Sequence, residues 1–140
     1  MFAHRRDITI EWGDCDPAGI VFFPRYLAIF DACTWSLFTA ALGMKKRALL
    51  AHFGTVGCPM VDLRARFLVP CTFGDEVVVE SRIGQLRRSS FSVEHRLLKA
   101  DELAVEGLET RVWSATDPDR PERLKSQPNP PEVRARLGDG

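Results

Sequence analysis

The first part of the chain predicts a strand followed by a loop. Residues 8–12 alternate apolar and polar side chains, which is the period-two pattern of a half-buried strand. Residues 13–19 then contain two glycines, one proline and two aspartates, all of which favour turns. We therefore expect the strand to end before a loop that leads into a short apolar run at residues 20–23.

The next segment has the period of a helix. Apolar residues recur every three or four positions through residues 24–42, and charge is nearly absent after Arg25. This pattern predicts one long helix that is buried on most of its surface. Pro24 suits the first helical turn, where its missing N–H has no partner to lose, and Gly43 suits the end of the helix. A second, short helix is expected over residues 45–53.

From residue 60 onward the apolar residues follow the period of strands. Turn-forming segments separate four predicted strands, at residues 60–71, 76–83, 90–98 and 103–115. The connections are too short for parallel crossovers, so antiparallel pairing is expected. His95 shares one face of its strand with Phe91, Val93 and Leu97.

The C-terminal residues 117–140 hold five of the nine prolines. We expect them to form an extension with a short helix at residues 132–137. The elements together predict one α+β domain over residues 1–140, in which a curved antiparallel β-sheet wraps around one long helix.

Charge and composition exclude several classes of function. Lysine plus arginine and aspartate plus glutamate each total 19 in the 140 residues. Nucleic-acid and membrane-surface binders favour a positive excess, so neither class of partner is expected. The N-terminus lacks an apolar stretch of signal-peptide length, and no apolar run reaches the roughly 18 residues of a membrane helix. A cytoplasmic location is therefore expected.

The cysteines and histidines suggest neither disulfides nor a metal site. The four cysteines and three histidines are scattered without a metal-ligand spacing. In a cytosolic chain such cysteines are expected to be free thiols. They are Cys15, Cys33, Cys58 and Cys71.

A motif spans the loop and the start of the long helix. Residues 13–26 read Gly-Asp-Cys-Asp-Pro-Ala-Gly-Ile-Val-Phe-Phe-Pro-Arg-Tyr. This segment closely resembles the signature of the 4-hydroxybenzoyl-CoA thioesterase family, and residues 87–91, Arg-Arg-Ser-Ser-Phe, resemble the basic turn of that family. The resemblance covers roughly residues 7–115. It implies a hotdog fold and the hydrolysis of an acyl-CoA thioester without a metal or redox cofactor.

The resemblance also assigns catalytic roles. The family's aspartate before Pro-Ala-Gly attacks, or activates water at, the thioester carbonyl, and Asp16 occupies that place. Local chemistry agrees because a carboxylate can act as nucleophile or general base toward a good leaving group; the alternative is an aspartate that only caps a turn. The resemblance assigns the oxyanion donor to the backbone N–H of Phe23. The position agrees with this role, because a helix N-terminus has unpaired N–H groups and a partial positive charge. Gly19 either admits substrate close to the backbone or is a turn glycine. Asp14 and Tyr26 are expected to be structural supports.

Further residues are candidates for substrate binding. Asp31, the only acidic residue in the predicted helix, either accepts a hydrogen bond from a hydroxyl of an aromatic acyl group or makes a structural hydrogen bond to the sheet. Arg87 and Arg88 either hold the phosphates of CoA or form a solvated turn. Ser89 is grouped with them, although family members often carry another basic residue there. Residues 44–55 are expected to help shape the acyl pocket.

Three other functions compete with hydrolysis. The Asp-x-Asp pair of Asp14 and Asp16 also occurs in phosphoryl-transfer enzymes, but these need Mg²⁺ ligands and a doubly wound α/β domain. A hydratase acting on enoyl-CoA usually pairs an aspartate with a histidine, and no histidine lies near Asp16 in the sequence. A non-catalytic acyl-CoA or acyl-carrier binding module remains the main alternative, although it would not need Asp16.

The resemblance finally predicts an assembly. Subunits of the family pair through their sheets, so a homodimer or a dimer-of-dimers homotetramer is expected. Arg87 and Arg88 would then serve a site that a neighbouring subunit completes.

Overall fold

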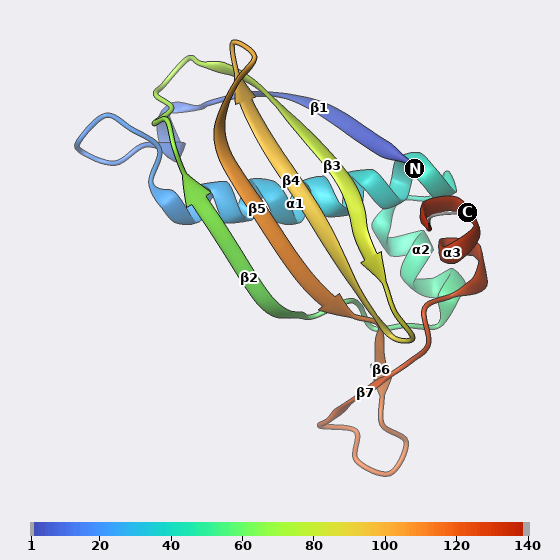
Figure 1. Ribbon diagram of the computed structural model, residues 1–140. Coiled ribbons are helices and arrows are strands. Elements are labelled where there is room, and N and C mark those ends of the chain that lie inside the picture. Colours follow the sequence, from blue (N-terminus) through green and yellow to red (C-terminus); the bar gives the residue numbers. More distant parts are fainter. Residues whose placement is uncertain (1, 139–140) are drawn as a thin grey trace.

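The computed structural model describes residues 2–138 and shows an antiparallel sheet that curves around a long helix (Figure 1). This arrangement confirms the expected α+β architecture. The sheet has the strand order β1-β3-β4-β5-β2. Its strands are β1 (Ala3–Thr9), β2 (Met60–Phe67), β3 (Glu76–Leu86), β4 (Ser90–Lys99) and β5 (Glu102–Val112).

The first strand lies earlier in the chain than predicted. The alternation indicated residues 8–12, but β1 begins at Ala3 and pairs with β3 as an exposed edge strand. Its polar residues fit that position, because edge strands tolerate charge. Sheet-like hydrogen bonding ends at Ile10, whose N–H donates to the carbonyl of Asp75 at 2.9 Å. Residues Trp12–Asp14 then form a short 3₁₀ turn instead of continuing the strand.

The four later strands of the sheet were predicted, but β2, β3 and β5 do not end at their predicted C-terminal residues. The strand predicted at 60–71 stops at Phe67, because Leu68 and Val69 both donate to the single carbonyl of Ala104 and break the ladder. The strand predicted at 103–115 stops at Val112. The chain then forms a small hairpin that the sequence pattern did not indicate, made of β6 (Ser114–Thr116) and β7 (Leu124–Ser126).

The three helices agree with the predictions to within about one residue at each end. They are α1 (Phe23–Leu42), α2 (Lys46–Phe53) and α3 (Pro131–Leu137). α1 ends at Gly43, which has the left-handed backbone (φ 73°) expected of a C-terminal glycine. α3 is docked on the core through its side chains Val133 and Leu137, which are fully buried. The α3 part of the C-terminal extension is therefore packed on the core.

No helix within residues 2–138 is by itself long and apolar enough to span a bilayer. α1 and α2 taken together meet a criterion of length and composition, but they are bent by 67° at the break between them.

The helix approaches the sheet closely at one glycine. Gly107 on β5 lies opposite His95 on β4. A Cβ atom at Gly107 would stand 2.8 Å from the ring of Phe30 on α1. The missing side chain thus makes room for Phe30, whose ring stacks on His95 with centroids 4.8 Å apart and planes nearly parallel.

The buried face of β5 is unusually polar. Glu109 and Arg111 both point toward α1, with exposed fractions of 0% and 4%, whereas Leu108 lies on the outer face and is 37% exposed. Burial of a charged side chain is costly unless it is paired and hydrogen-bonded. Partners for both charges must therefore lie between the sheet and the helix.

Candidate functional site

The predicted catalytic carboxylate lies in a turn that orients it. Gly19 donates its N–H to the carbonyl of Asp16 at 2.9 Å, which closes a four-residue turn. The N–H of Ala18 donates to Oδ1 of Asp16 at 2.9 Å. The second carboxylate oxygen has no hydrogen-bond partner among residues 2–138. Asp16 therefore caps a turn, which was the alternative to a catalytic role. Its second carboxylate oxygen is nevertheless unpaired in this part of the chain and could act as a nucleophile or base.

Gly19 serves the conformation of this turn. Its φ of 83° lies in the left-handed region that favours glycine. Nothing lies within 4 Å of the position that a Cβ would take. The turn role of Gly19 is therefore visible, and contact between its backbone and substrate stays a prediction.

The backbone N–H of Phe23, at the start of α1, is an unpaired donor within residues 2–138. Pro24 has no N–H, and the N–H of Arg25 donates to the carbonyl of Phe22 at 2.8 Å. The N–H of Phe22 donates to the carbonyl of Asp14 at 2.8 Å. The N–H of Phe23 has no partner within the described chain. It therefore has the property that an oxyanion donor needs.

Asp14 joins the loop to the helix. Its carboxylate accepts the N–H of Glu11 at 2.9 Å and pairs with the guanidinium of Arg25 at 2.9–3.0 Å. Tyr26 plays a similar part, because its hydroxyl accepts the N–H of Cys71 at 3.2 Å. Burial raises the pKa of the Tyr26 phenol, which therefore stays protonated at neutral pH. These contacts match the structural roles expected of Asp14 and Tyr26.

Asp31 makes the helix-to-sheet contact that one of its two alternatives predicted. Its Oδ1 accepts a hydrogen bond from the guanidinium of Arg111 at 2.7 Å. The Asp31 side chain is nevertheless 51% exposed, and its Oδ2 has no partner in the described part of the chain. The carboxylate is thus held from one side and remains open on the other.

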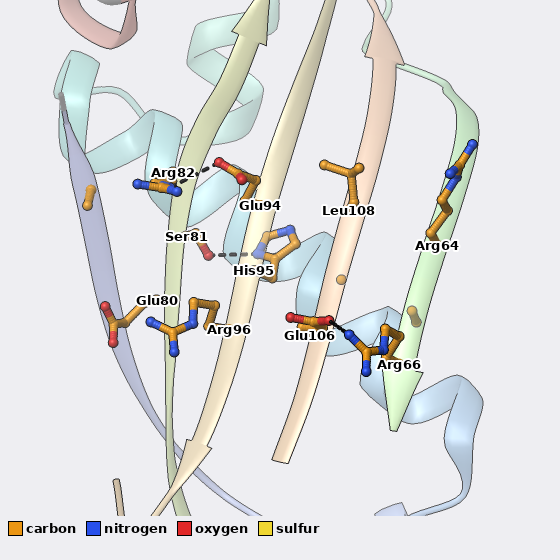
Figure 2. A pocket seen from close by; sticks show the side chains of 13 residues that line it. Arg64, Arg66, Glu80, Ser81, Arg82, Glu94, His95, Arg96, Glu106 and Leu108 are labelled. Atoms are coloured by element: carbon orange, nitrogen blue, oxygen red, sulfur yellow. Dashed lines mark hydrogen bonds and ion pairs between the residues drawn. The ribbon is translucent and has the colours of Figure 1, made fainter. Parts of the chain in front are cut away.

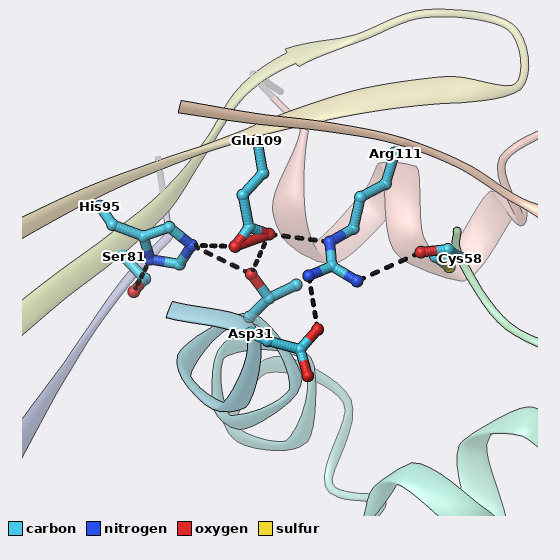
Figure 3. A network of polar contacts seen from close by, with 7 residues as sticks. Asp31, Cys58, Ser81, His95, Glu109 and Arg111 are labelled. Atoms are coloured by element: carbon cyan, nitrogen blue, oxygen red, sulfur yellow. Dashed lines mark hydrogen bonds and ion pairs between the residues drawn. The ribbon is translucent and has the colours of Figure 1, made fainter. Parts of the chain in front are cut away.

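Arg111 connects Asp31 to a buried polar network (Figure 3). Its Nε donates to Glu109 at 2.8 Å, and Glu109 also accepts the hydroxyl of Thr34 at 2.8 Å and contacts Nε2 of His95 at 3.0 Å. The other ring nitrogen of His95 lies 2.7 Å from the hydroxyl of Ser81. Every charged member is therefore hydrogen-bonded, as buried charges require.

The network keeps Glu109 ionised. Burial alone would raise the pKa of Glu109, but the hydrogen bonds from His95 and Arg111 outweigh it and hold this pKa below its usual value. Burial likewise opposes the charge on Arg111, and the hydrogen bond to Glu109 reverses that effect and raises the pKa of Arg111. Sequence reasoning missed this network. Its only local signal was the place of His95 on the apolar face of its strand.

The basic turn lies far from the predicted catalytic loop, residues 13–22, within one chain. Arg87 and Arg88 are exposed and Ser89 is half-buried, in the connection between β3 and β4. Figure 1 shows this connection near one end of α1 and the blue loop of residues 13–22 near the other end. Within a single chain, the loop that carries Asp16 leads directly into Phe23 at the start of α1, and this loop lies away from the turn of residues 87–90.

Comparison with known proteins places these features in a family. A model of the thioesterase-like superfamily matches residues 10–137. The chain belongs to this superfamily. It is 34% identical to the 4-hydroxybenzoyl-CoA thioesterase of Pseudomonas sp. (strain CBS-3) over 116 residues, which are 79% of this chain and 82% of that protein. It is 33% identical to a 1,4-dihydroxy-2-naphthoyl-CoA hydrolase of Synechococcus elongatus over 89 residues, 64% of this chain and 65% of that one.

The fold of this thioesterase matches solved structures along almost its whole length. A mutant of 4-hydroxybenzoyl-CoA thioesterase complexed with 4-hydroxybenzoyl-CoA superposes with a TM-score of 0.89 at 28% identity, and the match covers 98% of this chain and 99% of that one. A gentisyl-coenzyme A thioesterase matches with a TM-score of 0.82 at 30% identity, over 94% and 99% of the two chains. The predicted family, hotdog fold and thioester hydrolase class are confirmed.

A groove on the outer face of the thioesterase sheet is separate from the predicted site. It has a volume of about 520 Å³ and crosses β1, β3, β4, β5 and β2. Its rim is charged, with ion pairs between Arg66 and Glu106 at 2.9 Å and between Arg82 and Glu94 at 3.0 Å (Figure 2). None of the predicted site residues lines it. We therefore do not assign the acyl pocket to this groove.

The cysteines of the thioesterase are free thiols, as predicted. Burial raises the pKa of Cys33 to about 11 and that of Cys58 to about 12. Both thiols are therefore protonated at neutral pH and are poor nucleophiles. No three His, Cys, Asp or Glu side chains within residues 2–138 gather as metal ligands would. Hydrolysis without a metal or another cofactor stays a prediction.

Proposed function

We propose that this thioester hydrolase acts on an aromatic acyl-CoA, with Asp16 as its nucleophile or general base. One observation carries the proposal. The turn holds one oxygen of Asp16 and leaves the other unpaired, and the same loop leads into the unpaired N–H of Phe23. Both named relatives act on CoA thioesters of hydroxylated aromatic acids.

The chemistry follows from these two groups. In the nucleophilic route, the Asp16 carboxylate attacks the thioester carbon, the CoA thiolate leaves, and water then hydrolyses the mixed anhydride. In the general-base route, Asp16 takes a proton from the water that attacks the carbon, and that proton reaches the leaving thiolate. Both routes place negative charge on the carbonyl oxygen, which the N–H of Phe23 stabilises. Such a donor is typically worth about 3 kcal/mol in the transition state.

Asp31 is proposed to recognise a hydroxyl on the acyl group. Arg111 holds its Oδ1, which fixes the carboxylate, and its Oδ2 is unpaired. An ionised carboxylate accepts a hydroxyl hydrogen bond strongly. Residues 44–55, which include helix α2, are still proposed to help shape the acyl pocket.

Hydrolysis of a substrate panel tests both the reaction and the acyl group. We expect turnover of 4-hydroxybenzoyl-CoA to exceed that of short- and long-chain aliphatic acyl-CoAs. Asp31→Asn should lower kcat/KM for 4-hydroxybenzoyl-CoA about tenfold, because a charge-assisted hydrogen bond becomes a neutral one. Steady-state release of free CoA measures each rate.

Benzoyl-CoA is the matched control, because it lacks only the hydroxyl. Asp31→Asn should change its kcat/KM by less than about twofold. An equal loss on both substrates would remove the recognition role of Asp31. The absence of turnover on every thioester would favour the alternative, a non-catalytic acyl-CoA binding module.

Arg87, Arg88 and Ser89 are proposed to bind the phosphates of CoA. The two guanidinium groups are exposed, and the backbone N–H groups of Arg88 and Ser89 have no partner within the described chain. Successive unpaired N–H groups form a concave site for anions. The turn therefore combines backbone donors with two positive side chains.

A homodimer, or a pair of such dimers, is proposed to complete the site. β2 is an unpaired edge of the sheet and carries exposed apolar side chains, among them Met60, Val61 and Phe67. Such an edge is suited to pairing with another strand. Pairing also offers a second subunit to supply the phosphate-binding turn, since within one chain this turn and the loop of residues 13–22 lie near opposite ends of α1. Sedimentation velocity should show dimers or tetramers at assay concentrations, and a monomer would contradict this assembly.

A further inference from the structure

We infer that Asn129, in the C-terminal extension, is a positioning residue for binding of the CoA nucleotide by the turn of residues 87–90. The inference rests on the proposed phosphate-binding role of that turn. Asn129 would act through the backbone of the turn, and its own side chain would not touch the substrate. Figure 1 shows the C-terminal segment, in red, passing the β3–β4 connection on its way to α3.

Asn129 binds three carbonyl groups of the turn. Its side-chain Nδ2 donates to the carbonyl of Arg87 at 2.7 Å and to that of Ser90 at 3.0 Å. Its backbone N–H donates to the carbonyl of Arg88 at 2.7 Å. These contacts join residues about 40 positions apart in the sequence, and Asn129 itself is only 3% exposed.

The remaining carbonyl is also occupied. The carbonyl of Ser89 accepts the N–H of Trp113 at 3.0 Å. Arg134, on α3, adds a second donor to the carbonyl of Arg87. Every carbonyl oxygen of residues 87–90 therefore accepts at least one hydrogen bond from a donor within the protein.

This arrangement determines the polarity that the turn presents to a ligand. A carbonyl oxygen carries partial negative charge and would repel a phosphate. With the carbonyls held by internal donors, the N–H groups of Arg88 and Ser89 stay unpaired. A phosphate then meets donors and positive side chains together.

The amide of Asn129 suits this task better than other side chains would. Both hydrogens of Nδ2 are used, one for each carbonyl, and Oδ1 is buried without a partner. The flipped amide would place that oxygen against two carbonyl oxygens. The unpaired Oδ1 is a cost, so the structure tolerates one unsatisfied atom in order to hold two carbonyls. α3 fixes this segment through Val133 and Leu137, which are buried in the core.

The test compares substrates that differ only in the nucleotide. Asn129→Ala should raise KM for the acyl-CoA about tenfold, because the turn loses two of its hydrogen bonds. KM for the matching acyl-pantetheine, which lacks the nucleotide, should stay within about twofold. kcat should be unchanged on both substrates. Gln127→Ala is the matched control, since it removes an amide side chain from the same segment and should change neither KM.

The outcomes separate this inference from the proposed reaction. Equal changes of KM on the two substrates, or no change, would overturn the role of Asn129. If wild type hydrolyses no thioester, the proposed function fails, and calorimetric titration with adenosine 3′,5′-bisphosphate tests the inference instead. Weaker binding by Asn129→Ala than by wild type supports the inference. No binding by wild type overturns it. Should Asn129→Ala not fold, Arg134→Ala replaces it, since its exposed side chain holds the same carbonyl of Arg87. An unchanged acyl-CoA KM there would count against the inference.

Discussion

Asp16→Asn should lower kcat for the best acyl-CoA substrate by about 10²- to 10⁴-fold, the range that loss of a positioned acid–base group typically gives. An asparagine side chain still accepts the N–H of Ala18, so the turn should keep its conformation. The amide is neither a good nucleophile nor a base. KM should change little, because the carboxylate acts mainly in the transition state. Steady-state release of CoA measures both constants.

Asp101→Asn is the matched control for this change. Asp101 is exposed in the β4–β5 turn and has a φ of 64°, which asparagine adopts readily. Its kcat should equal that of wild type. An unchanged kcat in Asp16→Asn would disprove the role of Asp16. Single-turnover hydrolysis in ¹⁸O-water then separates the two routes, because label in the Asp16 carboxylate requires a covalent anhydride.

Arg111→Met should lower the free energy of unfolding by about 3–5 kcal/mol, the usual cost of removing one partner of a buried ion pair. The substitution leaves Glu109, which is 0% exposed, without the donor at 2.8 Å. It also releases Asp31 and the carbonyl of Cys58, which the guanidinium contacts at 3.2 Å. Urea denaturation at one fixed protein concentration measures the loss, since the stability of an oligomer depends on concentration.

The same network predicts that the free energy of unfolding depends on pH. Burial opposes ionisation of Glu109, but the hydrogen bonds from His95 and Arg111 hold its pKa in the folded protein below the ordinary value of 4.5. Its contribution to stability is therefore fully present above about pH 4.5 and is lost as the pH falls through the lower, folded-state pKa. Arg111→Met should weaken this contribution and make the protein unfold at a higher pH on acid titration.

Arg96→Met serves as the control for the loss of an arginine. Arg96 is exposed on the outer face of the neighbouring strand β4 (Figure 2). Its replacement should change the unfolding free energy by no more than about 0.5 kcal/mol. A loss in Arg111→Met no larger than this would show that the network contributes little to stability.

The geometry of the proposed catalytic loop could be predicted from sequence because it is local. Asp16, Gly19 and Phe23 lie within eight consecutive residues, and turn formation and the helix start fix their relative positions. The family motif could then assign their roles. The four later strands of the sheet followed from period-two patterns for the same reason, since each pattern reflects one face of one strand.

The buried network and the C-terminal contacts could not be predicted in this way. Glu109 meets Thr34 across 75 residues, and Arg111 meets Asp31 across 80 residues. The hydrophobic pattern is misleading in the second half of β5, because Leu108 lies on the outer face whereas the charged Glu109 and Arg111 are buried. Asn129 reads as part of a Pro-rich tail, and only the fold shows that its side chain binds the β3–β4 turn.

The polar inner face of β5 also specifies the alignment of the sheet. A slip of β5 by one residue would turn Glu109 and Arg111 outward and bring their neighbours to face α1. His95 would then be buried opposite a residue other than Gly107, and Phe30 would lose the space for its ring. The apolar side chains of β5 alone would tolerate such a slip, because Leu108 and Val112 would then face α1. His95, however, would lose the carboxylate of Glu109 as its partner. The buried charges therefore select one strand register among several that hydrophobicity would allow.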